Sequence, residues 1–464
     1  MISYLKSLFS NLHSLTSRIT MTNIVDPFRS AELSMLGEIW SSPTVWPTMR
    51  TLCDDCNGRF VATDDERRAA AFIRKSFEQY GLTNAHTEEF AVPGWKRGEC
   101  RLSVNGRELV CIGLPGTPPA DLEAPIVHLG DGEKEDFARV GEAAKGKIAL
   151  VRGKGSHRLE KYARAIQAGC IAFLFSNTEV GTLPPTGSLS WEHQAAPLPG
   201  VGIAYESLLR LERMAEDGEL LAHLQVKSEI YAATGLNVIA DIPGTNPELG
   251  MLMACAHYDG HDIAQGAIDN ATGTAAVMEA ARALMTVRDQ LKLGVRFALW
   301  SGEEVGMVGS GAYAAAHSAE LGQIKLVFNC DIVGNAGTFF MGLNGYDTDR
   351  LAAFMRQLAG KEHDVEVVGG VTIPYSDHFS FYLKGVPALM AATRGSKYPT
   401  LGPHTYGDTL DKVDMRALRS STAYTARVLL HLAHDPAPLP ARHATVDELR
   451  EVLRKAGYEN LLKA

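Results

Sequence analysis

The sequence lacks a membrane-spanning helix, a block of basic residues and internal repeats. No run of it reaches the roughly 18 consecutive apolar residues of a membrane-spanning helix. Its formal net charge is −9, and its 45 Lys and Arg residues form no basic block, so neither nucleic acid nor a membrane surface is an expected partner. Internal repeats and low-complexity tracts are also missing. Small molecules remain as the expected partners.

A secretory signal and a disulfide framework are missing as well. The first twenty residues contain no acidic residue, but they lack the unbroken apolar segment of about 7–15 residues that a signal peptide requires. We interpret residues 1–29 as a flexible N-terminal extension, with Met21 as an alternative start. The seven cysteines are an odd number and lie mostly in apolar stretches, which favours buried, reduced thiols. We therefore expect a cytoplasmic protein, with secretion as the alternative.

Length and composition predict two folded units. At 464 residues the chain exceeds the size of about 250–300 residues at which one hydrophobic core stops growing. Residues 30–109 and 234–435 form the main unit in our interpretation, because helical and strand-like patterns dominate both. Between them, residues 110–233 contain short apolar runs broken by Gly and Pro, which predict a small β-rich insert. The Pro-rich link and amphipathic helix of residues 436–464 form either a packing strap or an oligomer contact.

The second part of the main unit alternates strand-like and helical segments. Apolar runs of strand length include LNVIADIP, GMLMACA, GVRFALW, IKLVFN and PALMAA, and helical patterns between them include TAAVMEAARALM and DRLAAFMRQLAG. This alternation predicts an α/β fold, in which helices flank both faces of a mainly parallel sheet. Ligands of such sheets bind beyond the carboxyl ends of the strands.

Histidine and acidic residues follow four of these apolar runs. They are His257 directly after MLMACA, the pair Glu303 and Glu304 after VRFALWSG, Asp331 after KLVFNC, and His404 downstream of PALMAA. The carboxyl ends of parallel strands meet at one edge of the sheet, so residues far apart in the chain can share one cavity. Two imidazoles with several carboxylates suit Zn²⁺ or a related divalent ion.

The adjacent residues Glu303 and Glu304 are predicted to have different roles. Neighbouring side chains at the end of a strand point in different directions, so one carboxylate can bind a metal while the other acts on water as a general base. Asp259, two residues after His257, can accept a hydrogen bond from the second imidazole nitrogen and fix the tautomer. A loop-capping role for Asp259 stays open.

Five motifs together resemble a known family. AHYDG…GAIDNATG, WSGEEVGMVGS, NCDIVG, YSDHFSF and PHTYGDTL, in this order, are similar to the motifs of the di-zinc exopeptidases of metallopeptidase family 28. The similarity covers roughly residues 45–100 and 235–435. The segments KGKIALVRGKG and YARAIQAGCIAFLFSN resemble the protease-associated (PA) domain that some members carry as an insertion. The resemblance implies a zinc-exopeptidase fold with a PA insert at residues 110–233.

The resemblance also implies a set of site residues. Two Zn²⁺ ions per chain are expected, one held by His257 and Asp331 and the other by Glu304 and His404, with Asp269 bridging both and Glu303 as the general base. Asp377 in the SDH motif is expected to support a ligand, with a structural role as the alternative. Some members have a tyrosine immediately before the last histidine to steady the oxyanion. This chain has Pro403 there, so Tyr375 or Tyr406 is the candidate replacement.

The implied function is zinc-dependent hydrolysis of peptide bonds by a metal-activated water. The leading interpretation is an aminopeptidase that releases N-terminal amino acids. The alternative is a carboxypeptidase or dipeptidase of the same fold, for which Arg394 is the candidate to bind a substrate carboxylate. A non-catalytic, receptor-like protein is disfavoured, because every ligand position and the base are filled. Peptides are the expected substrates, and the oligomeric state stays open, with a homodimer as one option.

We expect the insert to restrict access to the metals and to contribute no catalytic group. Its histidines, His128, His157 and His193, are isolated in the sequence and show no metal-ligand spacing. They are interpreted as loop or surface residues.

Overall fold

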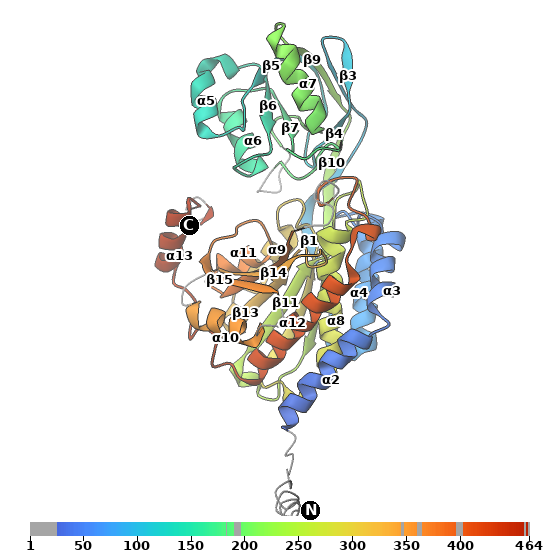
Figure 1. Cartoon of the computed structure of the whole chain (residues 1–464), viewed down its shortest axis with the longest axis vertical. Helices are drawn as coiled ribbons and strands as arrows, with labels where there is room; N and C mark the ends of the chain where they lie inside the picture. Colours follow the sequence, from blue (N-terminus) through green and yellow to red (C-terminus); the bar gives the residue numbers. More distant parts are fainter. Residues whose placement is uncertain are drawn as a thin grey trace, which may run out of the picture.

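The chain forms two bodies, each built on its own sheet. The computed structural model describes residues 26–181, 183–189, 196–344, 348–359, 364–395, 402–458 and 461–462. The two bodies lie one above the other along the long axis of the molecule (Figure 1). Most of the predicted extension at residues 1–29 lies outside the described residues, and the first described helix, α2, already begins at Pro27.

The main sheet places four parallel strands at its centre. Its strand order is β1-β10-β12-β11-β13-β16-β14-β15, and β12, β11, β13 and β16 run parallel to one another. Strands β10 and β14 pair antiparallel at the two flanks. The α/β fold predicted from the sequence is thereby confirmed. In chain order the strands are β1 (Thr83–Lys96), β10 (Glu229–Ile242), β11 (Met251–His257), β12 (Gly294–Trp300), β13 (Ile324–Cys330), β14 (Thr338–Asn344), β15 (Val365–Val371) and β16 (Ala388–Arg394).

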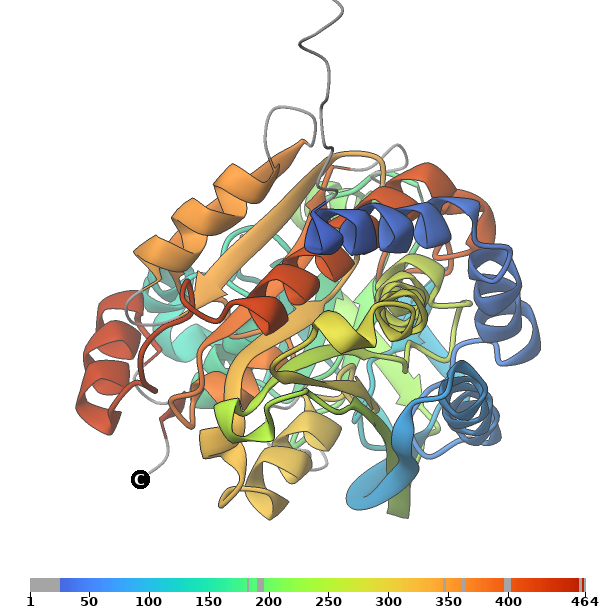
Figure 2. The ribbon, with the colours of Figure 1, turned by 90° about the horizontal axis from the view of Figure 1, so that it is seen from below.

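The central strands lie between two helical layers (Figure 2), and their alternate side chains belong to two different cores. In β11, Leu252 and Ala254 point into one core, whereas Met253 and Cys255 point into the other. Successive residues of a strand point to opposite faces, so a strand covered on both sides needs an apolar residue at every position. The first core includes α2 (Pro27–Ser41), α3 (Val45–Arg50), α4 (Asp64–Tyr80), α8 (Thr272–Met285), α10 (Asp349–Ala359) and α12 (Met415–His434), and the second includes α9 (Val308–Ala316), α11 (His378–Tyr382) and α13 (Val446–Ala456).

The last helix is a packing strap. Leu449 and Leu453 of α13 are buried in the second core. The helix is shorter than the amphipathic pattern of the sequence suggested, because Gly457 adopts the left-handed conformation, with φ 82°, and ends it. Within the described part of the chain, no helix combines the length and the apolar composition needed to cross a bilayer. The cytoplasmic location and the oligomeric state stay predictions.

The second body is the insert, and its sheet has the order β3-β2-β9-β5-β6-β7-β8-β4. Its strands begin at Cys100, ahead of the expected start of the insert at residue 110, because β2 pairs with β9. The long pair β1 and β10 joins the two bodies (Figure 1). The domain boundaries themselves stay a prediction. The elements are β2 (Cys100–Val104), β3 (Arg107–Leu109), β4 (Cys111–Gly113), β5 (Ala120–His128), α5 (Lys134–Val140), β6 (Ile148–Arg152), α6 (Arg158–Gln167), β7 (Ala172–Ser176), β8 (Gly200–Ile203), α7 (Tyr205–Glu216) and β9 (Leu221–Val226).

A buried arginine fixes the loop that follows β11. The guanidinium of Arg59, which is fully buried, donates to the carbonyl oxygens of Tyr258 at 2.6 Å, Leu52 at 2.8 Å, Gln265 at 2.7 Å and Gly266 at 2.7 Å. A buried cation is tolerated where hydrogen bonds replace its hydration. Arg59 therefore ties both ends of this loop to the segment before α4.

Replacement of Arg59 by Met should lower the free energy of unfolding by about 3–5 kcal/mol, because buried carbonyl oxygens lose a charged donor. Urea unfolding followed by circular dichroism measures this change. The control is Arg74→Met, which removes an exposed pair with Glu78 and should cost less than about 0.5 kcal/mol. Equal stability of the two variants would show that the loop does not depend on Arg59.

Candidate metal centre

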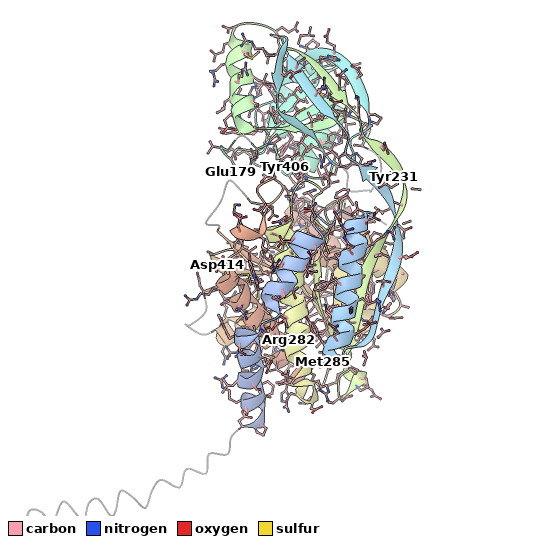
Figure 3. The ribbon with its side chains drawn as sticks, turned by 90° about the vertical axis from the view of Figure 1, so that its right-hand side faces the viewer. Glu179, Tyr231, Arg282, Met285, Tyr406 and Asp414 are labelled. Atoms are coloured by element: carbon pink, nitrogen blue, oxygen red, sulfur yellow. The ribbon has the colours of Figure 1, made fainter. Side chains whose placement is uncertain are left out.

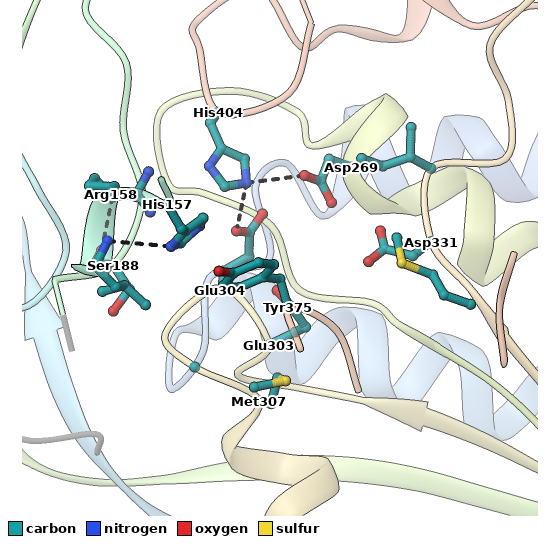
Figure 4. Close-up of a pocket in the computed structure, with 14 residues that line it drawn as sticks. His157, Arg158, Ser188, Asp269, Glu303, Glu304, Met307, Asp331, Tyr375 and His404 are labelled. Atoms are coloured by element: carbon teal, nitrogen blue, oxygen red, sulfur yellow. Dashed lines mark hydrogen bonds and ion pairs between the residues drawn. The ribbon is translucent and has the colours of Figure 1, made fainter. Parts of the chain in front are cut away.

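Loops that follow the central strands meet in one pocket between the two bodies (Figure 4). The main body contributes Asp269, Glu303, Glu304, Asp331 and His404 to its lining. His257 is the last residue of β11 and is buried just beneath. The structure therefore brings together all six residues that the sequence indicated as ligands or base.

These residues form two groups that share Asp269. In the first group, His257 Nε2 lies 3.2 Å from Asp269 Oδ1 and 3.4 Å from Asp331 Oδ1. In the second group, His404 Nε2 lies 3.2 Å from the other oxygen, Asp269 Oδ2, and 3.3 Å from Glu304 Oε2. Ligand atoms about 2.0–2.1 Å from a tetrahedral zinc ion are roughly 3.3 Å apart. Both groups have the spacing of ligands around one ion.

The chemistry of the two groups also fits cations. Burial raises the pKa of Glu304 well above its usual range, and the charge of Asp269 acts in the same direction. Burial opposes the charge of His257, but the carboxylates around it raise its pKa well above the usual value. Asp331 Oδ1 and Glu304 Oε1 are buried without a hydrogen-bond partner among the described residues. Buried carboxylate oxygens without a hydrogen-bond partner are available to ligate a cation.

Hydrogen bonds from neighbouring loops hold the carboxylates in place. Asp408 accepts hydrogen bonds from the backbone N–H groups of Ile268 at 2.7 Å and Asp269 at 3.0 Å. Ser376 donates to Asp331 Oδ2 at 2.7 Å. Its neighbour Asp377, which the SDH motif indicated for a supporting role, is fully buried, and its oxygens have no hydrogen-bond partner among the described residues. The contact to the ligand is thus made by the serine of the motif.

Asp259 supports the pair of glutamates. Its two carboxylate oxygens accept the backbone N–H groups of Glu303 at 3.2 Å and Glu304 at 3.3 Å. His257 Nδ1 lies 3.1 Å from the backbone carbonyl oxygen of Asp259 and 3.5 Å from its Oδ1. The expected role in fixing the tautomer of His257 stays a prediction, and the carboxylate also positions the loop after β12.

The three candidates for binding the oxyanion or a substrate carboxylate lie in different surroundings. Tyr375 lines the pocket, but its hydroxyl donates to Glu160 at 2.9 Å at the contact with the insert. Tyr406 is 50% exposed at the junction of the two bodies and does not line the pocket (Figure 3). Arg394, expected near a substrate carboxylate, instead pairs with Glu366 at 2.9 Å and covers the ring of Phe340, because its side chain leaves the end of β16 toward β14 and β15.

The sequence analysis missed His261. This buried histidine places Nε2 2.8 Å from Glu304 Oε2, and its ring stands nearly perpendicular to that of His404, with 4.7 Å between the centroids. The three side chains form one of two groups in the described chain that can hold a metal ion. The only signal in the sequence is its position four residues after His257.

The insert reaches the pocket as well. His157, Arg158, Leu159 and Ser188 line it together with the residues of the main body. We expected the insert only to restrict access to the metals, and these contacts with the pocket were not predicted. His157, expected in a loop or on the surface, lies in the pocket wall. His193 lies outside the described residues.

Comparisons with known proteins agree with this geometry. Residues 237–429 match the model of peptidase family M28, and residues 122–211 match that of the PA domain. The segment that carries the site therefore matches peptidase family M28. Carboxypeptidase Q of Mus musculus is 25% identical over 408 residues, which are 84% of this chain and 85% of that protein.

Two solved structures of similar proteins share the fold. A peptidase M28 precursor from Shewanella amazonensis superposes with a TM-score of 0.78 at 23% identity, covering 90% of this chain and 99% of that one. BSAP, described as a zinc aminopeptidase from Bacillus subtilis, gives a TM-score of 0.65 at 25% identity, with 87% of this chain and 96% of that one covered. Both solved structures cover most of this chain, so the fold of its two bodies is shared with them.

Proposed function

We propose that this protein is a zinc-dependent exopeptidase that binds two zinc ions and releases residues from the ends of peptides, most directly as an aminopeptidase. The observation that carries the proposal is the orientation of Asp269, whose two oxygens face two different histidine–carboxylate groups. One carboxylate shared in this way is suited to bridge two cations. The names of the relatives, a zinc aminopeptidase and a carboxypeptidase, support the same class of reaction.

The proposed ligands follow from the two groups. The first ion is assigned to His257 and Asp331, the second to Glu304 and His404, and Asp269 is shared between them. Bound zinc ions supply two things to amide hydrolysis, a water of lowered pKa and a positive charge near the scissile carbonyl oxygen. The imidazole and carboxylate donors match the preferences of zinc.

Glu303 is the proposed general base. Its carboxyl group lines the pocket beside both groups, and its backbone is held by Asp259. Burial raises the pKa of Glu303 well above its usual value, and the nearby charges of Asp331 and Asp377 add to this. Positive charge close to a carboxyl group lowers its pKa, which keeps Glu303 ionised in the loaded enzyme. Glu303 then takes a proton from the attacking water and returns it to the leaving amine.

Asp269→Asn should remove metal from both groups, whereas His404→Ala should chiefly empty the second. The difference follows because a shared carboxylate contributes to two ions and a terminal imidazole to one. Elemental analysis of the dialysed proteins should give about two zinc ions per wild-type chain, about one in the histidine variant and fewer in the aspartate variant. The same loss in both variants would contradict the shared role of Asp269.

Glu303→Gln should lower kcat by about 10²–10⁴-fold on an aminoacyl p-nitroanilide, with zinc content and thermal stability unchanged, because only the proton transfer is lost. Glu320→Gln, a change of an exposed glutamate outside the pocket, serves as the matched control and should leave kcat unchanged. Wild-type turnover by the Glu303 variant would remove this residue from the mechanism.

A further inference from the structure

The insert places a buried arginine in the wall of the pocket. Arg158, the first residue of α6, is 8% exposed and lines the same pocket as Glu304 and His404 (Figure 4). Its Nε donates to the carbonyl oxygen of Ser188 at 2.9 Å, and its Nη1 donates to that of Thr186 at 3.2 Å. These two bonds fix the position of the guanidinium group and leave N–H groups for another acceptor.

The charge of Arg158 is not neutralised by a neighbouring acid. Among the residues that the structure describes, no carboxylate forms an ion pair with its guanidinium group, and Nη2 has no hydrogen-bond partner. Burial lowers the pKa of Arg158 to about 10, and the charge of Glu304 acts in the opposite direction. The group is therefore cationic at neutral pH. A buried, unpaired charge is costly, and an anion that binds beside it recovers part of this cost.

The insert contacts the main body close to Arg158. The N–H of Thr186 in the insert donates to the carbonyl oxygen of His404 at 2.8 Å. The ring of His157, next to Arg158, stacks on Tyr375 of the main body with 4.4 Å between the centroids. The insert thus touches the main body directly beside the second metal group. A peptide bound at this group therefore lies against the insert.

We infer that Arg158 binds the free α-carboxylate of a short peptide, and that dipeptides are the preferred substrates of the enzyme. The inference rests on the proposed function and specifies its substrate class. A guanidinium group offers two parallel N–H donors that match the two oxygens of a carboxylate. Because Arg158 lies on the insert, a carboxylate bound to it also sets the direction in which a dipeptide lies. Arg394, the candidate from the sequence, is committed to Glu366 outside the pocket.

The first test compares Ala-Ala with its C-terminal amide on the zinc-loaded, full-length protein. The amide lacks the negative charge, so its KM should be about 10–100-fold higher, with a smaller change in kcat. Hydrolysis of both at the same KM would overturn the carboxylate site and leave the exopeptidase proposal standing. Failure to cleave either dipeptide or alanine p-nitroanilide would instead overturn the proposed function.

The second test uses variants. Arg158→Gln should remove the difference in KM between the acid and the amide, and Arg158→Lys should retain part of it, while zinc content stays that of the wild type. Arg394→Gln is the matched control and should keep the full difference. A full difference in the Arg158→Gln variant would show that another group binds the carboxylate and would overturn the assignment.

A second, independent inference concerns His261. Its Nδ1 lacks a hydrogen-bond partner in the described part of the chain, and its Nε2 contacts only Glu304 Oε2, at 2.8 Å, without the geometry of a hydrogen bond, although the residue is only 4% exposed. The nitrogen and oxygen atoms that it, Glu304 and His404 offer lie within 4.8 Å of one another. His261 does not line the substrate pocket, but it lines a small second cavity together with Asp269. The geometry points to His261 as an additional ligand of the second metal ion.

Cobalt reports directly on this assignment. His261→Ala in the full-length, Co²⁺-loaded protein should weaken binding of the second ion by roughly 10–100-fold and alter its visible absorption, while the first ion is unaffected. His317→Ala, which changes a histidine paired with Glu88 outside the site, is the control and should leave both unchanged. Weaker binding with an unchanged spectrum would mean that His261 only positions Glu304 and would overturn the assignment.

Discussion

The structure depends on the concentration of acidic groups at one buried edge of the main sheet. The side chains of Asp259, Asp269, Glu304, Asp331 and Asp377 are all buried around the end of β11. Like charges in a medium of low dielectric constant repel one another strongly. Burial raises the pKa of Glu304 well above its usual range and that of Asp377 to about 7. Divalent cations resolve the conflict, because they bring more positive charge than the protons they replace. The surrounding loops are built to hold these acids together before cations bind.

The strands of the sheet and hydrogen bonds between the loops keep these acids in place. Three of the proposed ligands, His257, Glu304 and Asp331, lie at or just after the ends of β11, β12 and β13. The other two, Asp269 and His404, come from longer connecting segments. Asn270 connects two of these ends, since it donates to the carbonyl oxygen of Cys330 at 2.9 Å and accepts the N–H of Ile332 at 3.0 Å. Because these side chains are already ordered, binding of a cation costs them little conformational entropy.

The sequence revealed the parts of the site that follow the strand pattern. His257, Glu304 and Asp331 each end an apolar run, and the period of the pattern alone places them at one sheet edge. The flanking strands β14 and β15 escaped notice because glycines interrupt their short apolar runs. Arg158 could not be found this way, because a helix-starting arginine in one domain looks like a surface residue until the fold places it over the other domain.

Access of a peptide to the pocket and recognition of its carboxylate are coupled if Arg158 of the insert binds that carboxylate while the main body holds the metal ions. In the insert, Arg158 donates a hydrogen bond to the carbonyl oxygen of Thr186, and the N–H of Thr186 donates to the carbonyl oxygen of His404. Any displacement of the insert along the β1–β10 connection would therefore remove Arg158 from the pocket and free the loop of a metal ligand together. A ligand shifts a conformational equilibrium by its difference in affinity for the two states. A peptide carboxylate bound to Arg158 would thus favour the closed arrangement in which His404 is best held.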